Sequence, residues 1–236
     1  ELAAARLEAL KAQIQPHFLF NTLNMVLPLI YRDPDSASRT LVQLGDLLRS
    51  SLERDATRLV PLRAELDFLN KYLDIQLVRF QSRLLAEFQV GDDVLEAAVP
   101  NLILQPLVEN AIKHGIAKQP GSGRVEITCR REEKCLLLRV WNTAGEETPK
   151  PADVSDGVGL SNIRERLDVI YGTRNYRFSW GRGDGGYEVT IRLPLSFIEE
   201  DAKTSETLRT MPHTEGEGAS GELEDSPLAR LARKAR

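Results

Sequence analysis

A histidine that directly follows a proline is the first residue whose type and surroundings could do chemistry. His17 follows Pro16 in the segment 13–21, and apolar residues surround it. A neutral imidazole nitrogen is a competent nucleophile toward a phosphoryl group. A lone histidine in such a setting is more often packed in a core. The nucleophile hypothesis therefore needs a phosphoryl donor site elsewhere in the chain.

A second group of polar residues interrupts the apolar segment 101–115. The side chains of Glu109, Asn110, Lys113 and His114 add four polar groups to a helix that is otherwise suited to burial. The spacing from Asn110 to Lys113 and His114 puts these three residues on one helix face. An amide, a cation and an imidazole on one face suit a polyphosphate that is chelated to a metal ion.

A pair of glycines that leads into a helix is the third candidate. Asp156, Gly157 and Gly159 come just before the helical pattern that begins at Leu160. Free N–H groups and the helix dipole favour phosphate at such a position, although G-x-G alone is more often only a turn. A dinucleotide fingerprint is disfavoured, because no third glycine follows at the required offset and the preceding segment is not a strand.

Three amphipathic helices should present the histidine. Apolar residues recur at helical spacing over residues 2–30, after the turn at 33–36, and over 61–80. Pro16 falls within the first pattern, where a proline kinks the helix and presents the following residues at a bend. The leucine stripes of the first and third helices also suggest a dimer, in which the N-terminal helices pair as a four-helix bundle.

The sequence after residue 83 changes to short β-prone segments with two helical segments between them. The strands are expected at 84–90, 125–130, 136–141, 176–180 and 187–193, and the helices at 102–114 and 160–171. This layout predicts the α+β class, with a mixed, mostly antiparallel sheet covered by helices. We expect a mobile loop at 146–155 and a disordered tail at 199–236.

Composition excludes several classes of protein. The 236 residues are 42% hydrophobic and 28% charged, which is typical of one or two globular units. The net charge of −4 gives no basic field for nucleic acid. Cys129 and Cys135 flank a charged hairpin tip and should stay reduced, as in a cytoplasmic protein, rather than form a disulfide or metal pair.

The start of the chain also carries information. It begins at Glu1 inside a helical pattern, and no stretch of eighteen apolar residues occurs. We therefore expect the cytoplasmic part of a longer protein whose upstream sensor or membrane segment is missing.

Together the three polar groups resemble the LytS-type sensor histidine kinases, whose phosphoacceptor motif is built around P-H-F-L-F-N. The resemblance covers residues 1 to about 196 in the content and the order of the motifs. It implies a helical dimerisation and phosphotransfer region at 1–83, an ATP-binding domain with the Bergerat fold of the GHKL ATPases at 84–198, and a tail at 199–236. It also implies an ATP-dependent protein-histidine kinase that passes its phosphoryl group to the receiver domain of a response regulator in a two-component phosphorelay.

The resemblance assigns roles to the polar residues. His17 is similar to the phosphorylated histidine, and Asn110 to the asparagine that holds Mg²⁺ at the ATP phosphates. Lys113 and His114 would lie beside those phosphates. No acidic residue follows His17 directly, so Glu109 is a candidate base by analogy with the GHKL ATPases. The alternative role for Glu109 is to orient Lys113, four residues along the helix.

The glycine pair and the preceding strand also have counterparts in the family. Asp156, Gly157, Gly159 and Leu160 resemble the glycine box that closes over the triphosphate, with 146–155 as the lid. Family members usually carry an aspartate where this chain has Asn142, and that carboxylate accepts a hydrogen bond from the adenine amino group. An uncharged amide oxygen is the weaker acceptor.

The third helix matches the family as well. The matching residues, which are interpreted as structural or dimer-forming, are Tyr72, Gln76, Arg79 and Phe80.

Two alternatives remain open beside the kinase. The first is a degenerate ATP-binding dimerisation scaffold without turnover, which Asn142 favours. The second is a GHKL ATPase that hydrolyses ATP for conformational work. The P-H-F-L-F-N segment argues against the ATPase, which has no use for it.

Overall fold

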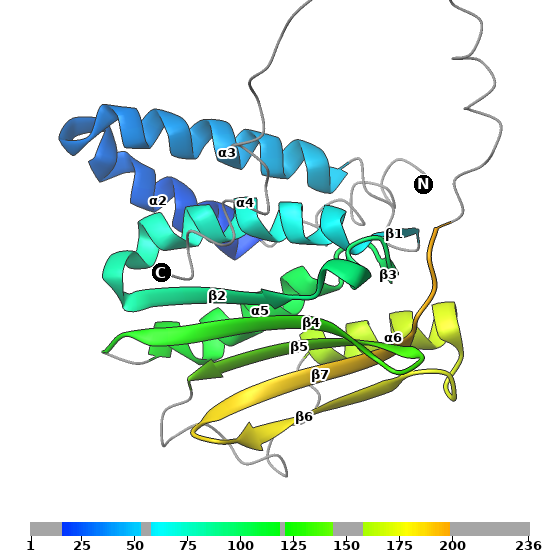
Figure 1. Cartoon of the computed structure of the whole chain (residues 1–236). Helices are drawn as coiled ribbons and strands as arrows, with labels where there is room; N and C mark the ends of the chain where they lie inside the picture. The colour runs from blue at the N-terminus through cyan, green and yellow to red at the C-terminus, as the bar shows by residue number, and fades with distance from the viewer. Residues whose placement is uncertain (1–15, 53–57, 119–120, 144–157, 199–236) are drawn as a thin grey trace, which may run out of the picture.

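The computed structural model describes residues 16–52, 58–118, 121–143 and 158–198. Three helices, α2 (Pro16–Arg32), α3 (Pro34–Leu52) and α4 (Leu62–Phe80), form a layer beside one edge of the main sheet (Figure 1). α3 begins as its sequence predicts, because Asp33 Oδ1 accepts the N–H of Ser36 at 3.0 Å and Pro34 occupies the first helical position. None of the described helices is long and apolar enough to cross a membrane.

The main sheet has five strands in the order β2-β4-β5-β7-β6. The strands are β2 (Leu84–Val90), β4 (Gly123–Glu132), β5 (Cys135–Thr143), β6 (Arg177–Gly183) and β7 (Gly186–Pro194). Among these strands only β2 and β4 pair in parallel. The helices α5 (Leu104–His114) and α6 (Val158–Tyr171) cover one face of the sheet (Figure 1). The expected α+β class with a mixed, mostly antiparallel sheet is confirmed.

Several details differ from the sequence-based expectation. β1 (Leu59–Pro61) and β3 (Ala98–Pro100) form a second, two-stranded sheet that was not expected. Pro28 is a further proline inside α2. The part of the expected first helix before Pro16, and with it the expected kink, lies outside the described residues. Three short 3₁₀ helices, η1 (Gln81–Arg83), η2 (Asp92–Val94) and η3 (Ile116–Lys118), were also not expected. The expected loop at 146–155 and the tail at 199–236 lie outside the described residues.

The period of two along β5 determines which side chains meet the helices. Leu136, Leu138 and Val140 are buried on the helix-covered face and belong to the main apolar core, which also includes residues of α2, α4, α5, α6 and β7. Asn142 continues the same alternation and is only 4% exposed. An amide at this position therefore lies inside the domain, close to the end of α5.

A carboxylate from α4 caps the start of α5. Ile103, the residue at the cap position, makes no side-chain cap of its own. Instead Glu65, which is 1% exposed, accepts the backbone N–H groups of Leu102 at 2.6 Å, Ile103 at 2.8 Å and Leu104 at 3.3 Å. Leu102 has a φ of 57°, in the left-handed region, and such a turn directs successive N–H groups toward one anion. α5 is thus fixed to α4 across 37 to 39 positions of sequence.

A second contact holds α6 at the same junction. The Arg166 guanidinium of α6 donates to the backbone carbonyl of Asn101, just before α5. The N–H of Asn101 in turn donates to the carbonyl of Arg58 at 3.0 Å. The start of α5 is therefore tied to α4, to α6 and to the residue that precedes β1.

We expect Glu65→Ala to lower the free energy of unfolding by about 2–4 kcal/mol, because three buried N–H groups lose their acceptor. Urea denaturation followed by circular dichroism measures the change. Asp67→Ala, at an exposed position of the same helix, is the control and should change the value by less than about 0.5 kcal/mol. Equal effects of the two substitutions would contradict the capping role of Glu65.

Candidate functional site

A cleft of about 430 Å³ lies between α2, α4, α5 and the start of α6. α2 contributes Phe18 and Asn21, and α6 contributes Gly159 and Asn162. α5 lines the opposite wall and α4 lines the floor. The cleft therefore joins the helix of the candidate nucleophile to both segments that were predicted to hold a polyphosphate.

The structure brings four of the predicted site residues into this cleft. These residues are Glu109, Asn110, Lys113 and Gly159. The approach to Gly159 is open, because a Cβ atom there would meet no other atom within 4 Å. An open helix N-terminus beside an ammonium group suits phosphate oxygens.

The remaining predicted residues are located elsewhere. His114 is largely exposed and is not among the described lining residues. Partial desolvation of its ring, together with the charges of Lys118 and Lys113, lowers its pKa. Leu160 is buried in the core next to Gly159. Asp156 and Gly157 lie outside the described residues.

His17 lies in the first turn of α2, and its side chain is outside the described part of the structure. The residue precedes Phe18 by one position and Asn21 by four, and both of these line the cleft. Positions four apart share a helix face. The backbone therefore puts position 17 on the face of α2 that borders the cleft.

Glu109 is a buried carboxyl group in the wall of the cleft. Its side chain is 9% exposed, and burial raises its pKa to about 7, against the opposing effects of a hydrogen bond from Gln105 and the charge of Lys113. The Gln105 amide donates to Glu109 Oε1 at 2.7 Å. A carboxyl group with a pKa near neutrality can take up or release a proton under ordinary conditions, as a general base must.

The floor of the cleft is a polar stripe on α4. Tyr72 and Gln76 are each 3% exposed, and Gln76 Nε2 donates to the Tyr72 hydroxyl at 2.8 Å. The ring of Phe18 packs on that of Tyr72 with centroids 5.1 Å apart. Burial and the charge of Glu109 raise the pKa of Tyr72 well above its usual value. A network of polar groups thus lies directly below the first turn of α2.

Arg79 completes the stripe at the rim of the cleft. Its guanidinium lies 4.8 Å from the centroid of the Phe80 ring, and burial lowers its pKa. From the sequence, these α4 residues were expected to be structural or dimer-forming. The spacing of four residues from Tyr72 to Gln76, and of three from Gln76 to Arg79, predicts that the three side chains share one helix face. That this face lies beside the predicted phosphate site could be seen only in the folded structure.

Asn142 is 4% exposed and is not among the described residues that line the cleft. Its amide donates to the carbonyl of Thr143 at 2.8 Å. A Cβ on Gly115 would collide with this amide and would lie 2.6 Å from the carbonyl oxygen of Ala111. Glycine is therefore required at the end of α5, where the helix approaches β5 most closely.

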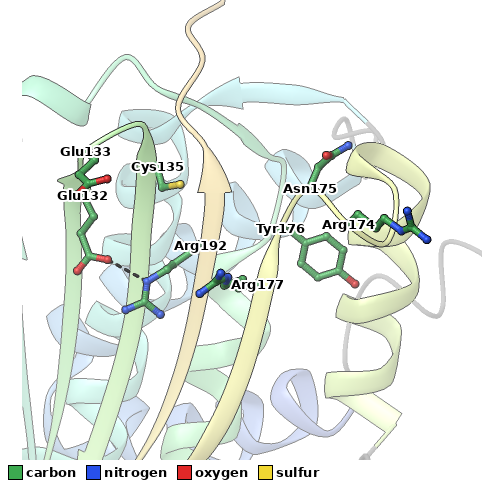
Figure 2. Close-up of a pocket in the computed structure, with 8 residues that line it drawn as sticks. All are labelled: Glu132, Glu133, Cys135, Arg174, Asn175, Tyr176, Arg177 and Arg192. Carbon is green, nitrogen blue, oxygen red and sulfur yellow. Dashed lines mark hydrogen bonds and ion pairs between the residues drawn. The ribbon is translucent and has the colours of Figure 1, made fainter.

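A second and larger cleft, of about 660 Å³, lies at the Cys135 end of β5 (Figure 2). Arg177 and Arg192 project into it, and Arg192 pairs with Glu132 at 2.9 Å. None of the predicted site residues is among its described lining residues. Cys129 and Cys135 are free, as expected, and burial raises the pKa of the Cys129 thiol to about 12.

Known proteins match the same part of the chain. A family model for histidine kinases matches residues 5–84. The sensor histidine kinase BtsS of Escherichia coli K12 is 36% identical over 194 residues, which are 82% of this chain and 34% of BtsS. The YwpD protein of Bacillus subtilis is 33% identical over 203 residues, which are 82% of this chain and 72% of YwpD. The sensor protein LytS of the same organism is 28% identical over 209 residues, which are 84% of this chain and 35% of LytS.

The chain is thus similar to sensor histidine kinases over more than four fifths of its length. The chain belongs to the LytS-type sensor histidine kinases. It spans about a third of the length of BtsS and of LytS.

We expect stability to fall as the pH rises from about 4.5 to 7, because folding raises the pKa of Glu109 from 4.5 to about 7. In this range the unfolded chain has released the proton that the folded chain retains. Glu109→Gln removes this penalty, so the variant should be more stable than the parent at pH 8, by on the order of 1 kcal/mol or more, and should gain less at pH 5. Urea denaturation at both pH values measures the difference. A gain that does not depend on pH would contradict the assignment.

Proposed function

We propose that the chain is the catalytic core of an ATP-dependent protein-histidine kinase that phosphorylates its own His17. The observation that carries the proposal is one cleft that α2, the helix of His17, shares with Asn110, Lys113 and Gly159. Catalysis in such a site consists mainly of positioning and of electrostatic stabilisation of the transferred phosphoryl group. Positioning and electrostatic stabilisation both require the helix of His17 and the phosphate-binding groups to border the same cleft.

The donor set in the cleft fits Mg²⁺–ATP. The Asn110 side chain would supply an oxygen ligand for Mg²⁺, which needs few protein ligands when phosphates provide the others. No group of three or more acidic, histidine or cysteine side chains that could hold a metal is present among the described residues. Lys113 and the open turn at Gly159 would hold the phosphates. Bound Mg²⁺–ATP supplies the phosphoryl group.

A proton acceptor is needed because Phe18, not an acidic residue, follows His17. Glu109 lines the cleft with a pKa of about 7 and is our candidate for the base.

Asn142 would contact the adenine through its amide oxygen. Its nitrogen already donates to the Thr143 carbonyl, which fixes the orientation of the amide. A neutral acceptor gives a weaker hydrogen bond than the aspartate that family members carry. We therefore propose that ATP binding is retained but weakened.

A second copy of the chain is the proposed partner of α2 and α3. Both helices carry large apolar side chains that are exposed in the single chain, such as Phe20 (63% exposed), Leu27 (59%) and Val42 (63%). A surface of this kind is typical of an interface. A homodimer would cover it, and a response-regulator receiver domain would take the phosphoryl group.

We expect the chain to incorporate label from γ-labelled ATP and Mg²⁺, and His17→Ala to abolish that labelling, because no other residue serves as the acceptor. The label should be acid-labile and base-stable. His213→Ala, a change of another of the three histidines, is the matched control and should label normally. Stable ATP binding without any label would support the degenerate scaffold. Phosphate release that His17→Ala does not alter would support the ATPase.

A further inference from the structure

We propose that Gln76 is a positioning residue for His17: its Oε1 accepts a hydrogen bond from one imidazole N–H, so that the other ring nitrogen is the nucleophile. The inference rests on the proposed function. It adds a residue of α4 that neither the phosphoacceptor motif nor the predicted phosphate-binding segments contain.

The starting observation is an unsatisfied acceptor. Gln76 is 3% exposed and lines the cleft. Its nitrogen donates to the Tyr72 hydroxyl at 2.8 Å, whereas Oε1 has no hydrogen-bond partner among the described residues. Buried polar atoms are almost always paired in native structures, and an unpaired one in a site indicates a missing group. The missing group must bring an N–H or an O–H.

The chemistry of the cleft restricts what that group is. Phosphate oxygens and the ionised form of the Glu109 carboxyl group are acceptors, so neither can satisfy another acceptor. Donors among the described lining residues, such as Arg79, Asn110 and Lys113, make no hydrogen bond to this oxygen. The first turn of α2 lies beside Tyr72 and Gln76, because the Phe18 ring packs on the ring of Tyr72, whose hydroxyl accepts the hydrogen bond from Gln76. Position 17 borders the same cleft through its spacing from Asn21. An imidazole N–H at that position is the donor that the proposed reaction itself requires.

An acceptor on the imidazole has a definite role in the transfer. The lone pair of one ring nitrogen forms the N–P bond while the bond from the γ-phosphorus to the bridging oxygen breaks, and ADP leaves with that electron pair. The ring becomes positive as the bond forms, and an oxygen on its other N–H stabilises this charge and fixes the tautomer. The proton stays on that nitrogen until a base takes it, and Glu109 in the same cleft is the candidate proposed above. Because Phe18 follows His17, no adjacent carboxylate does this.

The test compares Gln76→Met, which has a similar length but no amide oxygen, with Gln76→Glu, which keeps an acceptor. We expect Gln76→Met to slow the maximal rate of His17 labelling about 10- to 100-fold, with the KM for ATP within about twofold of the parent. Gln76→Glu should recover most of the rate. It should also move the acid limb of the pH profile to higher pH, because a carboxylate raises the pKa of an adjacent imidazole.

The controls separate this inference from the proposed function. Gln89→Leu, at an exposed position of β2, should leave rate and KM unchanged, and circular dichroism checks that each variant folds. If the parent takes no label, the proposed function fails. If the parent labels and Gln76→Met labels within about twofold of it, the role of Gln76 is overturned. If Gln76→Met does not fold, the pH profile of Gln76→Glu tests the role of Gln76. An acid limb at the same pH as in the parent overturns the inference.

Discussion

The three hydrogen bonds that Glu65 accepts are the interaction on which the arrangement of the cleft depends. They join the start of α5 to α4, and α5 carries Asn110 and Lys113 while α4 carries Gln76 and Arg79. α2 packs on the same α4 through Phe18 and Tyr72. A displacement of α5 along α4 would therefore separate the phosphate-binding groups from the acceptor helix. The buried carboxylate fixes the register because the backbone N–H groups at a helix start have no other partner.

Glu65 and Glu109, two buried carboxyl groups of the described helices, have different roles because their surroundings differ. Glu65 accepts three backbone N–H groups, which anchor it as a structural cap. Glu109 meets an amide and a more distant ammonium group, and burial raises its pKa to about 7. Such a division between a structural and a titrating carboxyl group is a common feature of active sites. The helices α4 and α5 thus carry both a structural carboxyl group and the proposed proton acceptor.

Local patterns predicted the fold class and part of the site. The period of 3.6 revealed α4, the turn at Asp33 revealed the start of α3, and the polar face of α5 revealed Asn110 and Lys113. What local patterns could not reveal were contacts across long stretches of chain, such as the cap of α5 by Glu65 and the approach of α4 to the cleft. His114 was grouped with Lys113 by helical spacing, yet it is exposed outside the cleft. The division of the chain near residue 83 stays a prediction.

The central claim is that the cleft delivers a phosphoryl group to α2 and to no other element. Mass spectrometry of tryptic peptides, prepared under basic conditions from the ATP-treated chain, locates that group directly. The account predicts one phosphate on the peptide of residues 12–32, in which His17 is the only histidine. A phosphate on the peptide that contains His114, or on any peptide without His17, would contradict it.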